Sequence, residues 1–188
     1  MTDIIQLAKK ILLIGDPSVG KTSLVRKFVL DIFDDRYLTT LGTKVTNKTL
    51  IIMSPELNKK VELKLMIWDV MGQQEYKLIQ ESAYLGASGA IIVGDITRKE
   101  TIDHLGGWVS DLFNITGVVP LTFVVNKVDL IENPSTSTEG LEQLAMSYEA
   151  PYFLTSAKSG ENVENTFQTL GKMLVNASLE DLVQSKVQ

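Results

Sequence analysis

The chain has 188 residues, is 44% hydrophobic and 22% charged, and carries a formal net charge of −5. A single domain of this size can bury a full core without disulfides, and its acidic balance argues against a nucleic-acid binder, which would present a basic face. The sequence contains no cysteine and one histidine, which excludes a disulfide scaffold, a thiolate metal site and a cysteine nucleophile.

Short apolar runs alternate along the chain with longer amphipathic stretches. The apolar runs are typical of strands buried on both faces of a parallel sheet, and they cover Ile11–Ile14, Leu63–Trp68, Ala90–Val93 and Leu121–Val125. The helical stretches lie near residues 21–30, 75–85, 101–113, 137–148 and 163–175. This alternation predicts βαβ units and an α/β fold with a doubly wound sheet.

One pair of strands breaks the alternation. Thr43–Ser54 and Lys60–Asp69 are both strand-like, and only five residues separate them. A link this short cannot make a parallel crossover, so the two strands should pair as an antiparallel hairpin. We therefore expect six strands, five parallel and one antiparallel, flanked by five helices. Residues 1–177 would form this domain, and residues 178–188 a C-terminal helix extension or tail.

A phosphate-binding loop is predicted after the first strand. Residues 15–22 read GDPSVGKT and fit the pattern G-x-x-x-x-G-K-[ST] between an expected strand, Lys10–Ile14, and an expected helix. Glycines let the backbone curl so that its N–H groups and the helix N-terminus face phosphate oxygens. Lys21 would reach the β- and γ-phosphates, and the hydroxyl of Thr22 would bind Mg²⁺. The residues expected around the nucleotide here are Asp16, Pro17, Ser18, Val19, Gly20, Lys21, Thr22 and Ser23.

Two later segments indicate which base is bound. The carboxylate of Asp129, just after the fifth expected strand, can accept from N1–H and the 2-amino group of guanine. Adenine offers neither donor, so a carboxylate there would reject it. The Ala157 N–H, after a short sixth strand, can donate to guanine O6. The predicted base-binding residues are Asn126, Lys127, Asp129, Ser156, Ala157 and Lys158.

Two further segments are candidates for sensing the γ-phosphate. Residues 68–73 read WDVMGQ at the end of a strand. Asp69 would hold Mg²⁺ through water, and the Gly72 N–H would meet the γ-phosphate. Gln73 would orient the attacking water, which makes it and Lys21 the candidate catalytic residues. Thr40, upstream, would complete the Mg²⁺ shell until hydrolysis releases it.

In order and spacing, these segments resemble those of Ras-superfamily small GTPases, and residues 72–97 are similar to the Rab family. The resemblance covers about residues 9–177. It implies a P-loop NTPase small G domain that binds GTP or GDP with Mg²⁺, hydrolyses GTP and acts as a molecular switch in membrane trafficking or signalling. It also implies that Phe33 packs on the guanine ring and that Tyr37 covers the phosphates.

The resemblance further implies that effector, exchange-factor and activating proteins contact residues 33–42 and 70–80. We expect a cytoplasmic monomer, at most peripheral to membranes and not attached through a lipidated cysteine. No arginine is evident near the phosphates, since Arg26 and Arg36 are poorly placed, so intrinsic turnover should be slow. His104 and Trp108 are assigned surface and packing roles.

Departures from the family pattern keep two alternatives open. Pro17 stands where glycine or serine is common, and Val70-Met71 where Thr-Ala is usual. Proline fixes φ and lacks an N–H, which alters the phosphate loop. One alternative is a scaffold that holds its nucleotide with little hydrolysis. The other, a P-loop ATPase or small-molecule kinase, requires that Asp129 not read the base.

Overall fold

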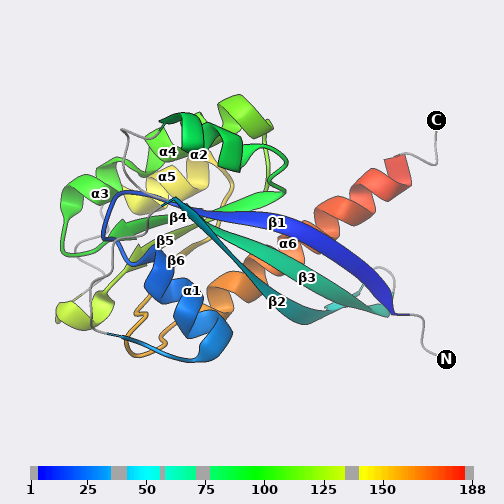
Figure 1. The fold of residues 1–188 in the computed structure, drawn as a ribbon, viewed down its shortest axis with the longest axis horizontal. Coiled ribbons are helices and arrows are strands. Elements are labelled where there is room, and N and C mark those ends of the chain that lie inside the picture. Colours follow the sequence, from blue (N-terminus) through cyan, green and yellow to red (C-terminus); the bar gives the residue numbers. More distant parts are fainter. Residues whose placement is uncertain (1–3, 35–41, 56–57, 71–76, 134–139, 185–188) are drawn as a thin grey trace.

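The computed structural model describes residues 4–34, 42–55, 58–70, 77–133 and 140–184. One six-stranded sheet in the order β2-β3-β1-β4-β5-β6 forms the centre of the molecule, with helices on both faces (Figure 1). The strands are β1 (Ile5–Ile14), β2 (Thr43–Ser54), β3 (Lys59–Val70), β4 (Gly89–Asp95), β5 (Leu121–Asn126) and β6 (Tyr152–Leu154). Only β2 runs antiparallel to its neighbour β3, so the predicted mixed sheet is confirmed.

The helices cover the two faces of the sheet unequally. They are α1 (Lys21–Leu30), α2 (Lys77–Tyr84), α3 (Lys99–Asp103), α4 (Leu105–Thr116), α5 (Leu141–Ser147) and α6 (Val163–Gln184), with a 3₁₀ turn, η2, at Val128–Leu130. One face carries α1 and α6, and the opposite face carries the other helices (Figure 1). The sheet therefore separates two hydrophobic clusters.

The helix predicted near residues 101–113 appears as two consecutive segments, α3 and α4. The break is confined to His104, whose N–H still donates to the Glu100 carbonyl (3.1 Å). The Trp108 N–H in turn donates to the His104 carbonyl (3.2 Å). Two glycines, Gly106 and Gly107, follow at once and weaken the helix locally. Taken together, α3 and α4 occupy the third of the five expected helical stretches.

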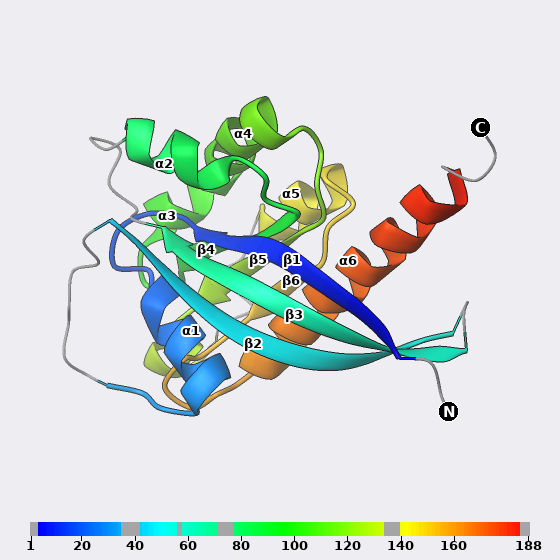
Figure 2. The ribbon, with the colours of Figure 1, turned by 45° about the vertical axis from the view of Figure 1, so that its right-hand side comes forward.

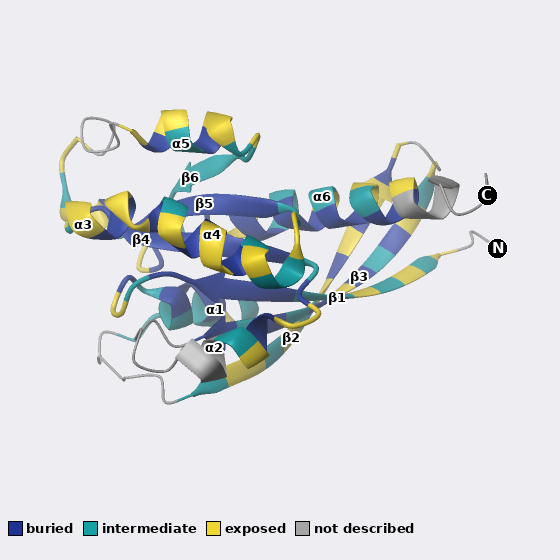
Figure 3. Ribbon diagram, turned by 90° about the horizontal axis from the view of Figure 1, so that it is seen from above, coloured by how far each residue is buried: buried dark blue, intermediate teal, exposed yellow. Residues whose placement is uncertain are grey.

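The strands differ in how they are buried. Every residue of β4 and β5 is buried, as their continuous apolar runs predicted (Figure 3). On the α1 and α6 side, the ring of Phe28 stacks on that of Phe167 with centroids 3.9 Å apart. This pair joins the helix after the phosphate loop to the long C-terminal helix.

β1 begins at Ile5, five residues before the predicted start at Lys10. Its first half pairs in parallel with β3 from Val61 onward. There the burial alternates, because Ile5 and Leu7 pack toward the core while their neighbours face solvent. A strand that is half-buried with period 2 has no continuous apolar run, so the predicted start of β1 at Lys10 was too late.

α6 packs against β2 and β3, and its C-terminal part points away from the extended ends of these strands (Figure 2). It continues without a break past residue 177, and Leu179 is buried in the core cluster. Across the described ranges, no helix combines the length and apolar character needed to cross a bilayer.

Gly171 sets the distance between α6 and the sheet. A Cβ atom at this position would lie 3.0 Å from Ile52 Cδ1 and 3.1 Å from Leu50 Cδ1. We expect Gly171→Leu to lower the free energy of unfolding by about 1–3 kcal/mol through overpacking, measured by urea denaturation. Gly107→Leu is the control, since Gly107 is also helical but has no atom within 4 Å of a Cβ position. Equal stabilities of the two variants would contradict this account of the packing.

Candidate functional site

The predicted phosphate loop joins β1 to α1 and is held close to its neighbours by two glycines. Gly15 has φ +140°, and a Cβ there would lie 2.1 Å from the Val93 carbonyl oxygen. Gly20 has φ +100°, and a Cβ there would lie 2.2 Å from Asn126 Nδ2. Both positions combine a left-handed backbone with no room for a side chain, so only glycine fits them.

Lys21 folds back over this loop. Its buried Nζ donates to the carbonyl oxygens of Gly15 (2.7 Å) and Asp16 (2.8 Å). Burial lowers the pKa of Lys21 to about 8, against the opposing pull of the Asp69 and Asp16 carboxylates. A buried ammonium held mainly by neutral carbonyls would gain from an anion in the loop.

Thr22 and Asp69 meet beneath the loop. The hydroxyl of Thr22 donates to Oδ2 of Asp69, which lies buried near the end of β3. Burial raises the pKa of Asp69 above its ordinary value, although the Thr22 hydroxyl and the charge of Lys21 oppose the shift. The other carboxylate oxygen, Oδ1, is buried and has no hydrogen-bond partner within the described part of the chain. An additional cation would satisfy it.

The oxygen donors here suit Mg²⁺, which prefers oxygen ligands and usually keeps several waters and substrate phosphates. Among the residues that the structure describes, no three acidic or histidine side chains gather to cage a metal. A cation at Thr22 and Asp69 would therefore take most of its ligands from water and phosphate.

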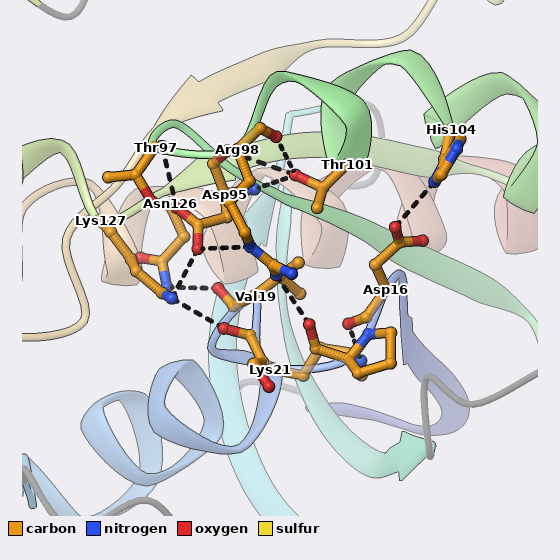
Figure 4. Close-up of polar contacts among 12 residues, drawn as sticks. Asp16, Val19, Lys21, Asp95, Thr97, Arg98, Thr101, His104, Asn126 and Lys127 are labelled. Atoms are coloured by element: carbon orange, nitrogen blue, oxygen red, sulfur yellow. Dashed lines mark hydrogen bonds and ion pairs between the residues drawn. The ribbon is translucent and has the colours of Figure 1, made fainter.

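Asn126 connects the phosphate loop to the predicted base-binding loops. Its Nδ2 donates to the Val19 carbonyl (3.0 Å), and its Oδ1 accepts from Thr155 Oγ1 and from the Ala157 N–H, both at 3.1 Å. The Ala157 N–H, which is predicted to bind guanine O6, thus donates to Asn126 in this structure. Lys127 Nζ reaches the Ser18 carbonyl (2.7 Å) on the same side (Figure 4).

The remaining base-binding candidates come together where β5 and β6 end. Ser156 Oγ donates to Oδ1 of the exposed Asp129 at 2.6 Å, which orients that carboxylate. Ser156 and Ala157 are buried, whereas Lys158 is exposed. The two segments singled out in the sequence therefore form one cluster at the carboxyl edge of the sheet, where ligands bind in open α/β folds.

Other candidates lie apart from this cluster or outside the description. Phe33 packs partly buried against the core cluster on the α1 side, and Ser23 lies half-buried in the first turn of α1. The remaining four candidates, which all belong to the segments predicted to sense the γ-phosphate, lie outside the described residues: Tyr37, Thr40, Gly72 and Gln73.

Two charged residues beside the phosphate loop, Asp95 and Arg98, were not predicted from the sequence. Asp95 ends β4, is buried and lies 2.6 Å from Lys127 Nζ and 3.3 Å from Arg98 Nε. Burial alone would raise the pKa of Asp95, but hydrogen bonds from Lys127 and Thr97 outweigh it and hold that pKa below its ordinary value. Arg98 Nη2 donates to the Pro17 carbonyl (2.7 Å). The sequence did hold a signal for Asp95, because it stands at the carboxyl end of an apolar strand, the same position that identified Asn126.

Known proteins of the Ras and Rab type are similar to this chain over most of its length. The Ras family profile matches residues 10–176. GTP-binding protein YPT52 of Saccharomyces cerevisiae is 33% identical over 94% of this chain and 86% of its own length. Ras-related protein RabJ of Dictyostelium discoideum is 37% identical over 91% of this chain and 65% of its own length. Ras-related protein Rab-8A of Bos taurus is 35% identical over 87% and 76%.

The lowered pKa of Lys21 should make stability depend on pH. Below pH 8 the folded and unfolded chains both hold the Lys21 proton, so the cost of burying the charge is constant. Between pH 8 and 10.5 only the unfolded chain holds it, so stability rises with pH. Over this range, the free energy of unfolding of the wild type should rise by about 1–3 kcal/mol relative to that of Lys21→Met, as measured by urea denaturation without added ligand. A difference independent of pH would contradict this prediction.

Proposed function

The chain belongs to the Ras family of small GTPases, and from that premise we propose how its residues bind guanine nucleotide and hydrolyse GTP. The phosphates would lie in the loop of residues 15–22, against its backbone N–H groups and Lys21. The base would lie between the loops after β5 and β6. The observation that carries the proposal is Asn126, whose amide bonds both Val19 of the phosphate loop and Ala157 of the base loop.

Guanine selectivity would come from Asp129 and Ala157. The Asp129 carboxylate, oriented by Ser156, would accept from N1–H and the 2-amino group of the base. On binding, the Ala157 N–H would donate its hydrogen bond to guanine O6 instead of to Asn126 Oδ1, and Asn126 would lie at the edge of the guanine ring. Phe33 would have to leave part of its present packing to stack on the base.

The oxygen atoms of Thr22 and Asp69 fit a hydrated Mg²⁺ ion, which Thr22 would bind directly and Asp69 through water, and the Thr40 hydroxyl would complete the shell. Bound there, the metal would neutralise charge on the phosphates. The positive charge of Lys21 would lie beside the β- and γ-phosphates and stabilise the charge that builds up during phosphoryl transfer. Gln73 would hold the attacking water in line with the γ-phosphate. Intrinsic turnover would be slow, with a partner protein required for acceleration.

We further propose a Rab-like switch in membrane trafficking or signalling, since the Rab and Ypt relatives match most of the chain. Residues 33–42 and 70–80 would change with the γ-phosphate and contact effectors, exchange factors and activating proteins. Loss of the contacts made by Thr40 and Gly72 on hydrolysis would release both segments.

Asp129→Asn should change the preferred base. The new amide offers a donor where the carboxylate accepted, so affinity for GTP should fall at least about 100-fold while affinity for xanthosine triphosphate rises. Competition against a labelled guanine nucleotide measures both. Asp103→Asn, an exposed substitution of the same kind on α3, is the control and should retain the wild-type preference. Comparable affinities of the wild type for GTP and ATP would refute guanine selectivity.

Gln73→Leu should slow hydrolysis about tenfold or more and leave GTP bound, because leucine cannot orient the water. The measurement is single-turnover conversion of bound GTP to GDP after addition of Mg²⁺, followed by chromatography. Gln74→Leu, the neighbouring glutamine, serves as the control. If the wild type itself retained GTP over many hours, a nucleotide-holding scaffold would replace the GTPase mechanism.

A further inference from the structure

Three side chains from one segment, residues 98–108, hold two adjacent residues of the phosphate loop. Arg98 Nη2 donates to the Pro17 carbonyl at 2.7 Å. His104 Nδ1 lies 2.8 Å from Asp16 Oδ2, and Trp108 Nε1 donates to Asp16 Oδ1, also at 2.8 Å. Both carboxylate oxygens of Asp16 are therefore engaged, one by His104 at the junction of α3 and α4 (Figure 4) and one by Trp108 in α4.

The two strongest donors are themselves fixed. Trp108 is 5% exposed and packs in the cluster on the α4 side of the sheet. The Arg98 guanidinium is held from behind by the buried carboxylate of Asp95. The hydroxyl of Thr101 donates to the Arg98 carbonyl (2.7 Å) and accepts from the Asp95 N–H (2.8 Å), which fixes the turn between β4 and α3. Because both side chains are already held in place, binding the loop costs them little conformational entropy.

The contact with Pro17 uses the one backbone group that this residue can offer. Proline has no N–H to give to a phosphate, so only its carbonyl can anchor the loop at this position. The positive charge of Arg98 is also among the groups that lower the pKa of the Lys21 amine, after burial.

We propose that Arg98, His104 and Trp108 form a clamp that positions the phosphate loop, so that α3 and α4 slow the release of bound nucleotide. This proposal rests on the proposed function. Release requires the loop to loosen around the phosphates, and a loop held at Asp16 and Pro17 loosens less often. The three are positioning residues, since they act on the nucleotide through the loop. Hydrogen bonds to charged groups are strong enough that losing one should speed release about tenfold.

The test is the dissociation rate of a fluorescent GDP analogue from the full chain, chased with excess GDP in Mg²⁺. Arg98→Gln and Trp108→Phe should each release the analogue about tenfold faster than wild type. Phenylalanine keeps most of the packing of Trp108 and removes only its donor. Lys99→Gln removes the exposed cation next to Arg98 and is the matched control, with a rate equal to wild type.

A second measurement separates a clamp from general loosening of α4. Because Trp108 acts through Asp16, the double variant Asp16→Ala/Trp108→Phe should release the analogue no faster than Asp16→Ala alone. Loosening of α4 would instead make the two effects multiply, which would overturn the clamp. Wild-type rates in both Arg98→Gln and Trp108→Phe would also overturn it, while leaving the proposed function intact. Failure of the wild type to retain the analogue would overturn both.

Discussion

The carboxamide of Asn126 is the interaction on which the candidate site depends. One amide group, buried at the end of β5, donates to the phosphate loop at Val19 and accepts from Thr155 and Ala157. Gly20 leaves no space for any side chain against this amide. Aspartate here would lose the donor, and leucine would leave several buried groups unpaired. The parallel sheet makes this connection possible, because it ends β1, β5 and β6 at the same edge.

Charge burial is the second constraint, and it explains why the site suits a polyanion with a divalent cation. Lys21 is buried with a lowered pKa, and Asp69 is buried with a raised pKa and one unpartnered oxygen. Each is destabilised by the lack of an opposite charge close enough to compensate for lost hydration. Asp95 shows the contrast, because Lys127 and Arg98 pair with it and its pKa is lowered. Binding a phosphate and a cation would relieve the first two groups and leave the third unchanged.

The fold was largely predictable because its signals are local. Continuous apolar runs gave β4 and β5, and the five-residue link fixed the antiparallel hairpin. The start of β1 was wrong because a half-buried strand at the edge of the core has no such run. In the site, the motif at residues 15–22 and the position of Asn126 directly after an apolar run can be recognised from the sequence alone. The contacts of Arg98 and Trp108 have no such signal in the sequence, because these side chains reach residues 16 and 17 only through tertiary packing, across more than 80 residues of sequence.

The phosphate loop shows how local restriction and distant contacts combine. Gly15 and Ser18 have positive φ values, and Pro17 between them has a φ restricted by its ring. Such a backbone is costly to keep in a single conformation unless its surroundings hold it. The carbonyl groups of residues 15 to 18 accept from Lys21, Arg98 and Lys127, so the loop is held from outside by cationic side chains. A loop already held in this way needs less ordering when its N–H groups bind an anion.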